Sequence, residues 1–107
     1  MAKFEKTFRG DFDELLAKIE KTVLNRSLTA KLRYAVDYRT ELGRCSVRLF
    51  ERYSFTSAHS VSMNVTLFQA GEEIQICVLT NRSDYGIELK ESTWGEIAFL
   101  ETLEDAL

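Results

Sequence analysis

The 107-residue sequence contains no proline, two cysteines and one histidine. Long hydrophobic runs are also missing: no uninterrupted apolar run exceeds four residues, whereas a membrane-spanning helix needs about 20. Residues 1–6 have no apolar core of the kind that a signal peptide requires. We therefore expect a soluble, cytoplasmic chain with no membrane association.

Side chains suited to metal binding or disulfide formation do not cluster in the sequence. Cys45 and Cys77 are separated by 31 residues, and neither has a second thiol or a histidine at ligand spacing. We expect two reduced thiols, with no metal ion and no cofactor. Asp84, Glu88 and Glu91 are candidates to gather a divalent cation, but their spacing matches no calcium loop.

The only histidine, His59, lies in segment 56–60 without a metal or catalytic partner nearby in the sequence. Ser57, Ser60 and Ser62 are close, but serine chemistry also needs an oriented base and an oxyanion site, which no motif here indicates. We expect a solvated loop histidine. The chain lacks a recognisable catalytic motif, which favours a non-enzymatic role.

The net charge of −3 is unevenly distributed along the chain. Residues 1–26 carry six basic and five acidic groups, residues 27–60 carry six and three, and residues 61–107 carry two and nine. A basic centre beside an acidic carboxyl-terminal part can steer anions toward one side or attract the other half of the same molecule. We favour the intramolecular use.

Between Leu28 and Val78 lie four segments in which apolar and polar residues alternate, and this pattern predicts a four-stranded antiparallel meander. A turn over residues 40–43 pairs Arg39 with Arg44. A five-residue connection over 56–60 and a tight turn at 70–71 then predict the later pairs. These are Tyr34 with Leu49, Val36 with Val47, Phe55 with Val61, Tyr53 with Met63, Leu49 with Leu67, Leu67 with Ile74, Val65 with Ile76 and Met63 with Val78. In this register, one face of the sheet is aliphatic throughout.

Two helices flank the predicted meander. A short strand over residues 3–9 precedes a helix that Asp11 caps with Glu14, and its apolar stripe is Phe12, Leu15, Leu16, Ile19 and Val23. The chain is expected to turn through residues 81–86, and residues 87–91 form an optional fifth strand. A second capping box at residues 93–96 opens a helix whose arc holds Phe99, Leu100, Leu103, Ala106 and Leu107.

The predicted fold is one two-layer α+β domain over residues 1–107, in which both helices cover the aliphatic sheet face. The order of elements is similar to that of TATA-binding-protein-like and helix-grip folds, and this analogy carries no function. The expected core is Phe12, Leu15, Ile19, Leu32, Tyr34, Val36, Val47, Leu49, Met63, Val65, Leu67, Ile74, Ile76, Val78, Phe99 and Leu103.

Three segments, residues 2–13, 48–54 and 61–66, resemble a family of short uncharacterised bacterial proteins. The opening reads Ala-Lys-Phe-Glu-Lys-Thr-Phe-Arg-Gly-Asp-Phe-Asp, and the third segment reads Val-Ser-Met-Asn-Val-Thr. The similarity extends over the whole chain. It implies a bacterial, cytoplasmic, single-domain protein and transfers no functional residue.

The predicted register places arginines and aromatic rings side by side on the sheet face away from the helices. The candidate binding residues there are Arg33, Arg48, Phe50, Arg52, Asn64 and Phe68. Such a surface can form a homodimer interface, because arginine and phenylalanine are enriched at interface cores. It can also stack single-stranded nucleic acid, or it can be ordinary solvated surface. Self-association is our leading hypothesis.

The predicted register also places the acidic Glu51 within the aliphatic face, where an unpaired carboxylate would be costly. One interpretation is a small-molecule pocket between sheet and helices, with Tyr34, Tyr38 and Tyr53 supplying hydroxyl groups and Glu51 binding the ligand or acting as a base. The alternative is a structural ion pair with Lys6. The sequence identifies no ligand.

Overall fold

The computed structural model describes residues 1–54, 59–83 and 93–107. The elements are β1 (Ala2–Arg9), α1 (Phe12–Arg26), β2 (Lys31–Thr40), β3 (Gly43–Ser54), β4 (His59–Gln69), β5 (Glu73–Ser83) and α2 (Thr93–Glu104). The predicted α+β class and the order strand, helix, strands, helix are confirmed. Strand β5 continues to Ser83, so the turn expected to begin at residue 81 was wrong. The optional strand at residues 87–91 and the acidic group at 84, 88 and 91 lie outside the described residues.

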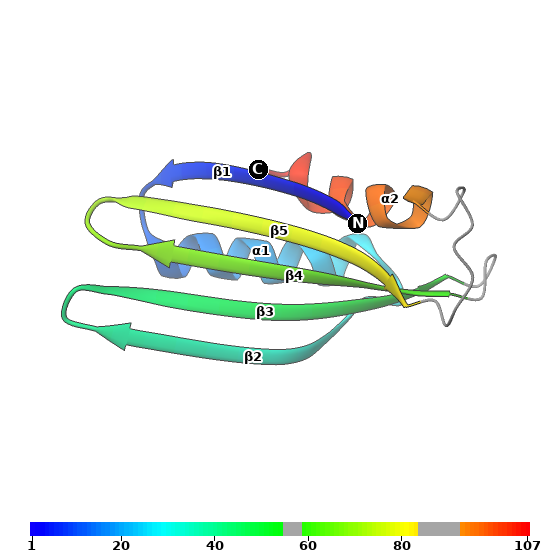
Figure 1. The fold of residues 1–107 in the computed structure, drawn as a ribbon, viewed down its shortest axis with the longest axis horizontal. Coiled ribbons are helices and arrows are strands. Elements are labelled where there is room, and N and C mark those ends of the chain that lie inside the picture. The colour runs from blue at the N-terminus through cyan, green and yellow to red at the C-terminus, as the bar shows by residue number, and fades with distance from the viewer. Residues whose placement is uncertain (55–58, 84–92) are drawn as a thin grey trace.

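The five strands form one antiparallel sheet in the order β1-β5-β4-β3-β2. Strands β1 and β2 are therefore the edges, and α1 connects one edge of the sheet to the other. In Figure 1 the sheet lies toward the viewer, α1 lies behind it and α2 lies beside β1. Within the described part of the chain, no helix covers the sheet face toward the viewer, which we call the open face. None of the described helices is both long and apolar enough to span a membrane.

Helix α1 begins where the sequence predicts. The carboxylate of Asp11 accepts a hydrogen bond from the backbone N–H of Glu14 at 2.9 Å, as an N-cap should. The apolar stripe of α1 and that of α2 then pack on the sheet in one core. Its buried members are Phe12, Leu16, Ile19, Val23, Phe50, Val61, Met63, Val65, Leu67, Ile74, Ile76, Val78, Phe99, Leu100 and Leu103.

The β2–β3 hairpin has the predicted register, with Arg39 opposite Arg44 and Val36 opposite Val47. The β3–β4 register is wrong by three residues. Leu49 lies opposite Asn64 rather than Leu67, and Phe50 lies opposite the buried Met63. Because opposite residues share a face and neighbours alternate, an odd shift exchanges the two faces of β3.

This exchange corrects part of the expected core. Tyr34, Val36, Val47 and Leu49 lie on the open face, whereas Phe50 is fully buried under the helices. A bulge between Leu32 and Tyr34 puts Leu32 opposite Phe50, on the helix side, where it remains partly exposed. The β4–β5 register differs by two residues, with Leu67 opposite Ile76, so the faces of β4 and β5 are as predicted.

The helix side of β3 accepts arginines because the helices and β2 supply partners for them. Arg44 pairs with Asp13 on α1 at 2.8 Å and lies over the ring of Phe12. Four residues further along the strand, Arg48 pairs with Glu20 on α1. Their aliphatic stems lie along the core while their charged ends meet carboxylates. The register predicted from the sequence was based on apolar residues alone, so it did not take these ion pairs into account.

Candidate functional site

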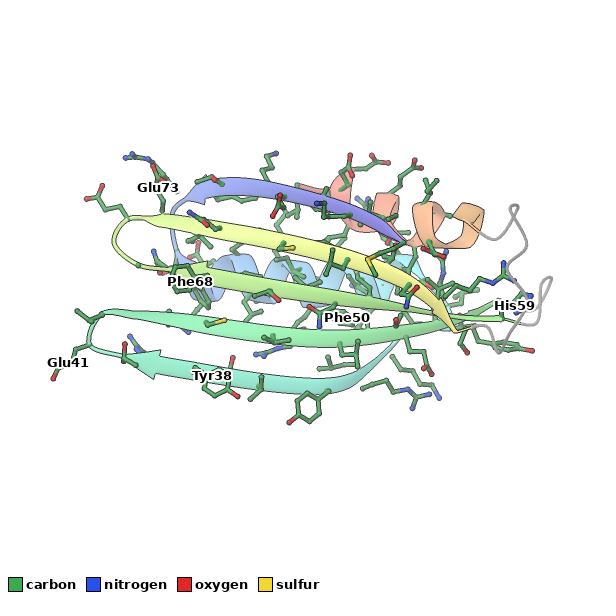
Figure 2. All side chains as sticks on the ribbon, in the orientation of Figure 1. Tyr38, Glu41, Phe50, His59, Phe68 and Glu73 are labelled. Atoms are coloured by element: carbon green, nitrogen blue, oxygen red, sulfur yellow. The ribbon has the colours of Figure 1, made fainter. Side chains whose placement is uncertain are left out.

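The open face carries an apolar patch over β2, β3 and the start of the β4–β5 hairpin. We define the apolar patch as Tyr34, Val36, Tyr38, Cys45, Val47, Leu49 and Phe68. Tyr34 lies opposite Leu49, Tyr38 lies opposite Cys45, and Cys45 lies opposite Phe68, so the side chains form one continuous surface. Tyr38 and Phe68 are labelled in Figure 2 near the same end of the sheet.

Several members of the apolar patch are exposed to an extent unusual for large apolar groups. Tyr34 is 61% exposed, Tyr38 is 63% and Phe68 is 47%. Every residue of β2 except Val36 is exposed, so the strand contributes little to the core under the helices. An uncovered group of apolar side chains on one face is typical of an interaction surface.

The far half of the open face is mainly polar, although β5 also places Cys77 and Leu79 on it. Strand β1 places Lys3, Glu5 and Thr7 on it, and on β4 the Thr66 hydroxyl donates to the Asn64 side chain at 3.1 Å. The open face therefore divides along the strands, with its apolar half over β2 and β3 and its polar half over β1 and β5.

Two shallow hollows lie on or beside the open face. One, of about 310 Å³, lies where the β2–β3 hairpin meets the β4–β5 turn, and it is lined by Tyr38, Thr40, Leu42, Gly43, Arg44, Cys45, Phe68 and Ala70. Its exposed lining is mainly apolar. The other, of about 520 Å³, crosses the polar half and is lined by Glu5, Lys6, Thr7, Thr66, Phe68, Gln75, Ile76 and Cys77.

The predicted binding set does not form one surface. Arg48, Phe50 and Arg52 lie on the helix side of β3, whereas Asn64 and Phe68 lie on the open face. The physical reason is the three-residue shift in register. Arg33, the remaining member, forms an ion pair with Glu51 at 3.1 Å. The alternation of arginine and aromatic side chains expected on the open face was therefore wrong.

Arg48 is the centre of a polar network under the helices. Its side chain is 8% exposed, its Nε lies 2.6 Å from a Glu20 oxygen, and its Nη2 lies 3.0 Å from an Asp37 oxygen. Nη1 donates to the carbonyl oxygens of Val36 and Val47. Burial lowers the pKa of Arg48, but the hydrogen bonds to Glu20 and Asp37 outweigh it and raise the pKa overall. These contacts give Arg48 a structural role between α1, β2 and β3.

Arg52 is likewise turned toward the helices. Its guanidinium lies 4.7 Å from the centre of the Phe99 ring on α2, and burial lowers the pKa of Arg52. A cation over an aromatic face is a stabilising contact within the molecule. Arg52 thus joins β3 to α2 as Arg44 joins β3 to α1.

Glu51 lies on the open face, so a pocket around it between sheet and helices was wrong. Its strand neighbours are Lys31 and Ser62, and its ion-pair partner is Arg33. The expected pair with Lys6 is also wrong, because the Lys6 ammonium donates to the Leu107 carbonyl oxygen at 2.7 Å. The other proposed pocket residues, Tyr34, Tyr38 and Tyr53, are on the open face too.

His59 begins strand β4 and is half-buried, so the expectation of a solvated loop histidine was wrong. Its Nε2 lies 3.0 Å from Nη2 of Arg82 on β5. Cys45 and Cys77 are partly buried, and no disulfide joins them. Among residues 1–54, 59–83 and 93–107, no three His, Cys, Asp or Glu side chains come together to hold a metal ion.

Sequence reasoning found the residues of the apolar patch but placed most of them in the core. The signal that separates the two faces of β3 is the arginine at every fourth position, 44, 48 and 52, combined with acidic Asp13 and Glu20 on the predicted helix. Side chains four apart lie on one face of a strand, so their partners identify the helix side.

Comparison with known proteins gives a family and no activity. No curated protein shows a significant match to the sequence. A family model does match, and it covers residues 1–107. The chain therefore belongs to the Family of unknown function (DUF6054).

Proposed function

We propose that the protein is a non-enzymatic interaction module that self-associates through the apolar patch on its open face. The observation that carries this proposal is the continuous apolar surface of β2 and β3, which the described helices leave uncovered. Covering such a surface gains about 25 cal/mol for each Å² of apolar area removed from water. A second copy covers it with an equally apolar surface.

The size of the open face is compatible with a stable dimer. Five strands spaced about 4.8 Å apart, each with about ten residues at 3.3 Å, give a face of roughly 800 Å². Standard protein interfaces bury about 800 Å² on each partner. Two open faces packed together would form a sandwich of sheets with helices on both outer sides.

Charge on the open face favours a second copy over nucleic acid. The apolar patch contains no charged residue, and Arg33, which precedes Tyr34 in the sequence, is already paired with Glu51. Nucleic-acid surfaces need cations directed at phosphates. Arg48 and Arg52, the arginines expected to do this, contact Glu20, Asp37 and Phe99 instead.

Pairing between the β2 edges of two copies has less support than packing of their faces. Strand β2 has a bulge between Leu32 and Tyr34, and it carries charged Lys31, Arg33 and Arg39. Bulges and charges on an edge strand discourage a further strand from pairing with it. The apolar side chains of β2 are on its open face, which favours face-to-face contact.

Native mass spectrometry tests the proposal because it reports subunit number and retained ligand together. We expect the unmodified chain to give a dimer without added mass. Val47→Glu puts a charge in the centre of the apolar patch and should shift the spectrum to monomer. Ala17→Glu adds the same charge at an exposed position on α1 and should leave the dimer intact.

Two results would contradict the proposal. One is a monomer of the unmodified chain at every concentration tested. The other is a monomer with constant extra mass, which would support a small-molecule function and direct attention to the hollows on the open face.

A further inference from the structure

We infer that the hollow where the β2–β3 hairpin meets the β4–β5 turn is a binding site for an uncharged, planar aromatic molecule the size of a single ring. The aromatic side chains of Tyr38 and Phe68 line its sides. Its floor is formed by small residues, Gly43, Cys45 and Ala70. This inference goes beyond the proposed function, because it concerns a small-molecule ligand and holds for a single chain.

The spacing of the strands sets the width of the hollow. Tyr38 on β2 and Phe68 on β4 both lie opposite Cys45, one on each side of β3 (Figure 2). Adjacent strands are about 4.8 Å apart, so these two aromatic side chains leave the sheet about 9.6 Å apart. Aromatic rings in contact have their centres about 4.5–7 Å apart. One further ring therefore fits between Tyr38 and Phe68 and contacts both.

The floor of the hollow is low because the two hairpins pack closely at Gly43. A Cβ atom at this position would lie 2.5 Å from the backbone carbonyl oxygen of Gln69, which is closer than real Cβ atoms come. Any side chain at position 43 would force β3 away from the end of β4. Beside Gly43, Cys45 contributes only a thiol and Ala70 only a methyl group. Backbone packing and small side chains together leave the space that a ligand can occupy.

The lining of the hollow favours an uncharged apolar ligand. Tyr38 is 63% exposed, Phe68 is 47% and Leu42 is 88%, so a ring bound among them removes apolar surface from water. Among the described residues that line the hollow, Arg44 alone is charged, and its guanidinium pairs with Asp13 on the helix side at 2.8 Å. A charged ligand would find no counter-ion in this lining.

The volume of the hollow indicates a small ligand that binds weakly. The hollow measures about 310 Å³, at the lower limit of the roughly 300–1,000 Å³ typical of ligand pockets. It is also shallow, so a bound ring keeps part of its surface in water. We therefore expect a dissociation constant of about 1 mM for a single-ring compound.

Titration with phenol, followed through the backbone amide signals in NMR spectra, tests the inference. The Val47→Glu chain is used because Val47 does not line the hollow and because a monomer leaves the open face uncovered. We expect saturable shifts at Cys45 and Ala70, with a dissociation constant of about 1 mM. Cyclohexanol has a similar size and the same hydroxyl group but no planar ring, and it should bind about five times more weakly or worse.

Substitutions in the same chain locate the site. Phe68→Ala removes one aromatic side and Cys45→Leu fills the floor, and each should weaken phenol binding about fivefold or more. Tyr53→Ala is the matched control. Tyr53 is another exposed tyrosine of the open face, 43% exposed, but it lies outside the hollow and near the other end of β3, so its replacement should leave the dissociation constant unchanged.

Three results would overturn the inference. They are phenol shifts that do not saturate, equal phenol binding by the Phe68→Ala chain, and equal binding of phenol and cyclohexanol. None of these results would contradict self-association through the apolar patch. A monomeric unmodified chain would overturn that proposal and leave this inference in place.

Discussion

At the scale of single residues, Arg48 is the clearest example of a polar group that stabilises the fold. A guanidinium at 8% exposure meets two carboxylates and two backbone carbonyl oxygens. The cost of removing it is mainly the cost of leaving its partners without a cation. Its contribution therefore depends on how well water can reach Glu20 and Asp37.

We expect Arg48→Ala to lower the free energy of unfolding by about 2–3 kcal/mol, below the 3–5 typical of a fully buried pair because both carboxylates are partly exposed. Urea denaturation monitored by circular dichroism measures this change. Arg9→Ala is the matched control, because Arg9 pairs with exposed Glu72 and Glu73 and should change stability by less than about 1 kcal/mol. Equal effects of the two substitutions would contradict the role given to Arg48.

Asp37 and Asp13 make stability depend on acid pH. The hydrogen bond from the Ser46 hydroxyl, at 2.6 Å, and then the bond from Arg48 lower the pKa of Asp37. The hydrogen bond from Arg44 lowers the pKa of Asp13. Each carboxyl group thus takes up a proton at higher pH in the unfolded chain than in the folded one.

The stabilisation from these two groups is present above the unfolded pKa of about 3.9 and is lost as the pH falls toward the folded pKa. We expect the urea midpoint to fall between about pH 5 and pH 3. Ser46→Ala should make this fall smaller, because the largest cause of the lowered pKa of Asp37 is gone. An identical pH dependence of the unmodified and Ser46→Ala chains would contradict this assignment.

At the scale of elements, strand β3 explains which parts of the fold could be predicted. Helix α1 and the β2–β3 hairpin depend on local signals, the Asp11 cap and the short turn at residues 40–43, and both were correct. The β3–β4 register depends on a longer connection and on which face of β3 meets the helices. Both faces of β3 carry apolar residues, so the periodicity alone could not show which face packs against the helices. The ion pairs of Arg44 and Arg48 with α1 join residues that are far apart in the sequence. These pairs identify the helix side of β3, and the arginines predicted to bind on the open face lie on that helix side instead.

Alanine substitution on the two faces of β3 tests this register. In the monomeric Val47→Glu chain, Phe50→Ala should lower the free energy of unfolding by about 3–5 kcal/mol, because it leaves a cavity under the helices. Leu49→Ala should cost less than about 1.5 kcal/mol there, because Leu49 is on the open face. The register predicted from the sequence alone gives the opposite order.

At the scale of the whole molecule, the described helices and the apolar patch lie on opposite faces of one sheet. The helix side is closed by the apolar core and by the arginines of β3. The open face keeps Tyr34, Tyr38 and Phe68 in contact with solvent in a single chain. Packing two open faces together would cover these residues with the sheet of a second copy. The molecule would then function through the surface formed by the pair.

Sedimentation velocity of the unmodified chain over a concentration series tests self-association through the apolar patch most directly. We predict a sedimentation coefficient that rises with concentration from the monomer value to the dimer value at micromolar concentrations. The Val47→Glu chain should stay at the monomer value throughout. A single monomer value for the unmodified chain across the whole series would contradict the account.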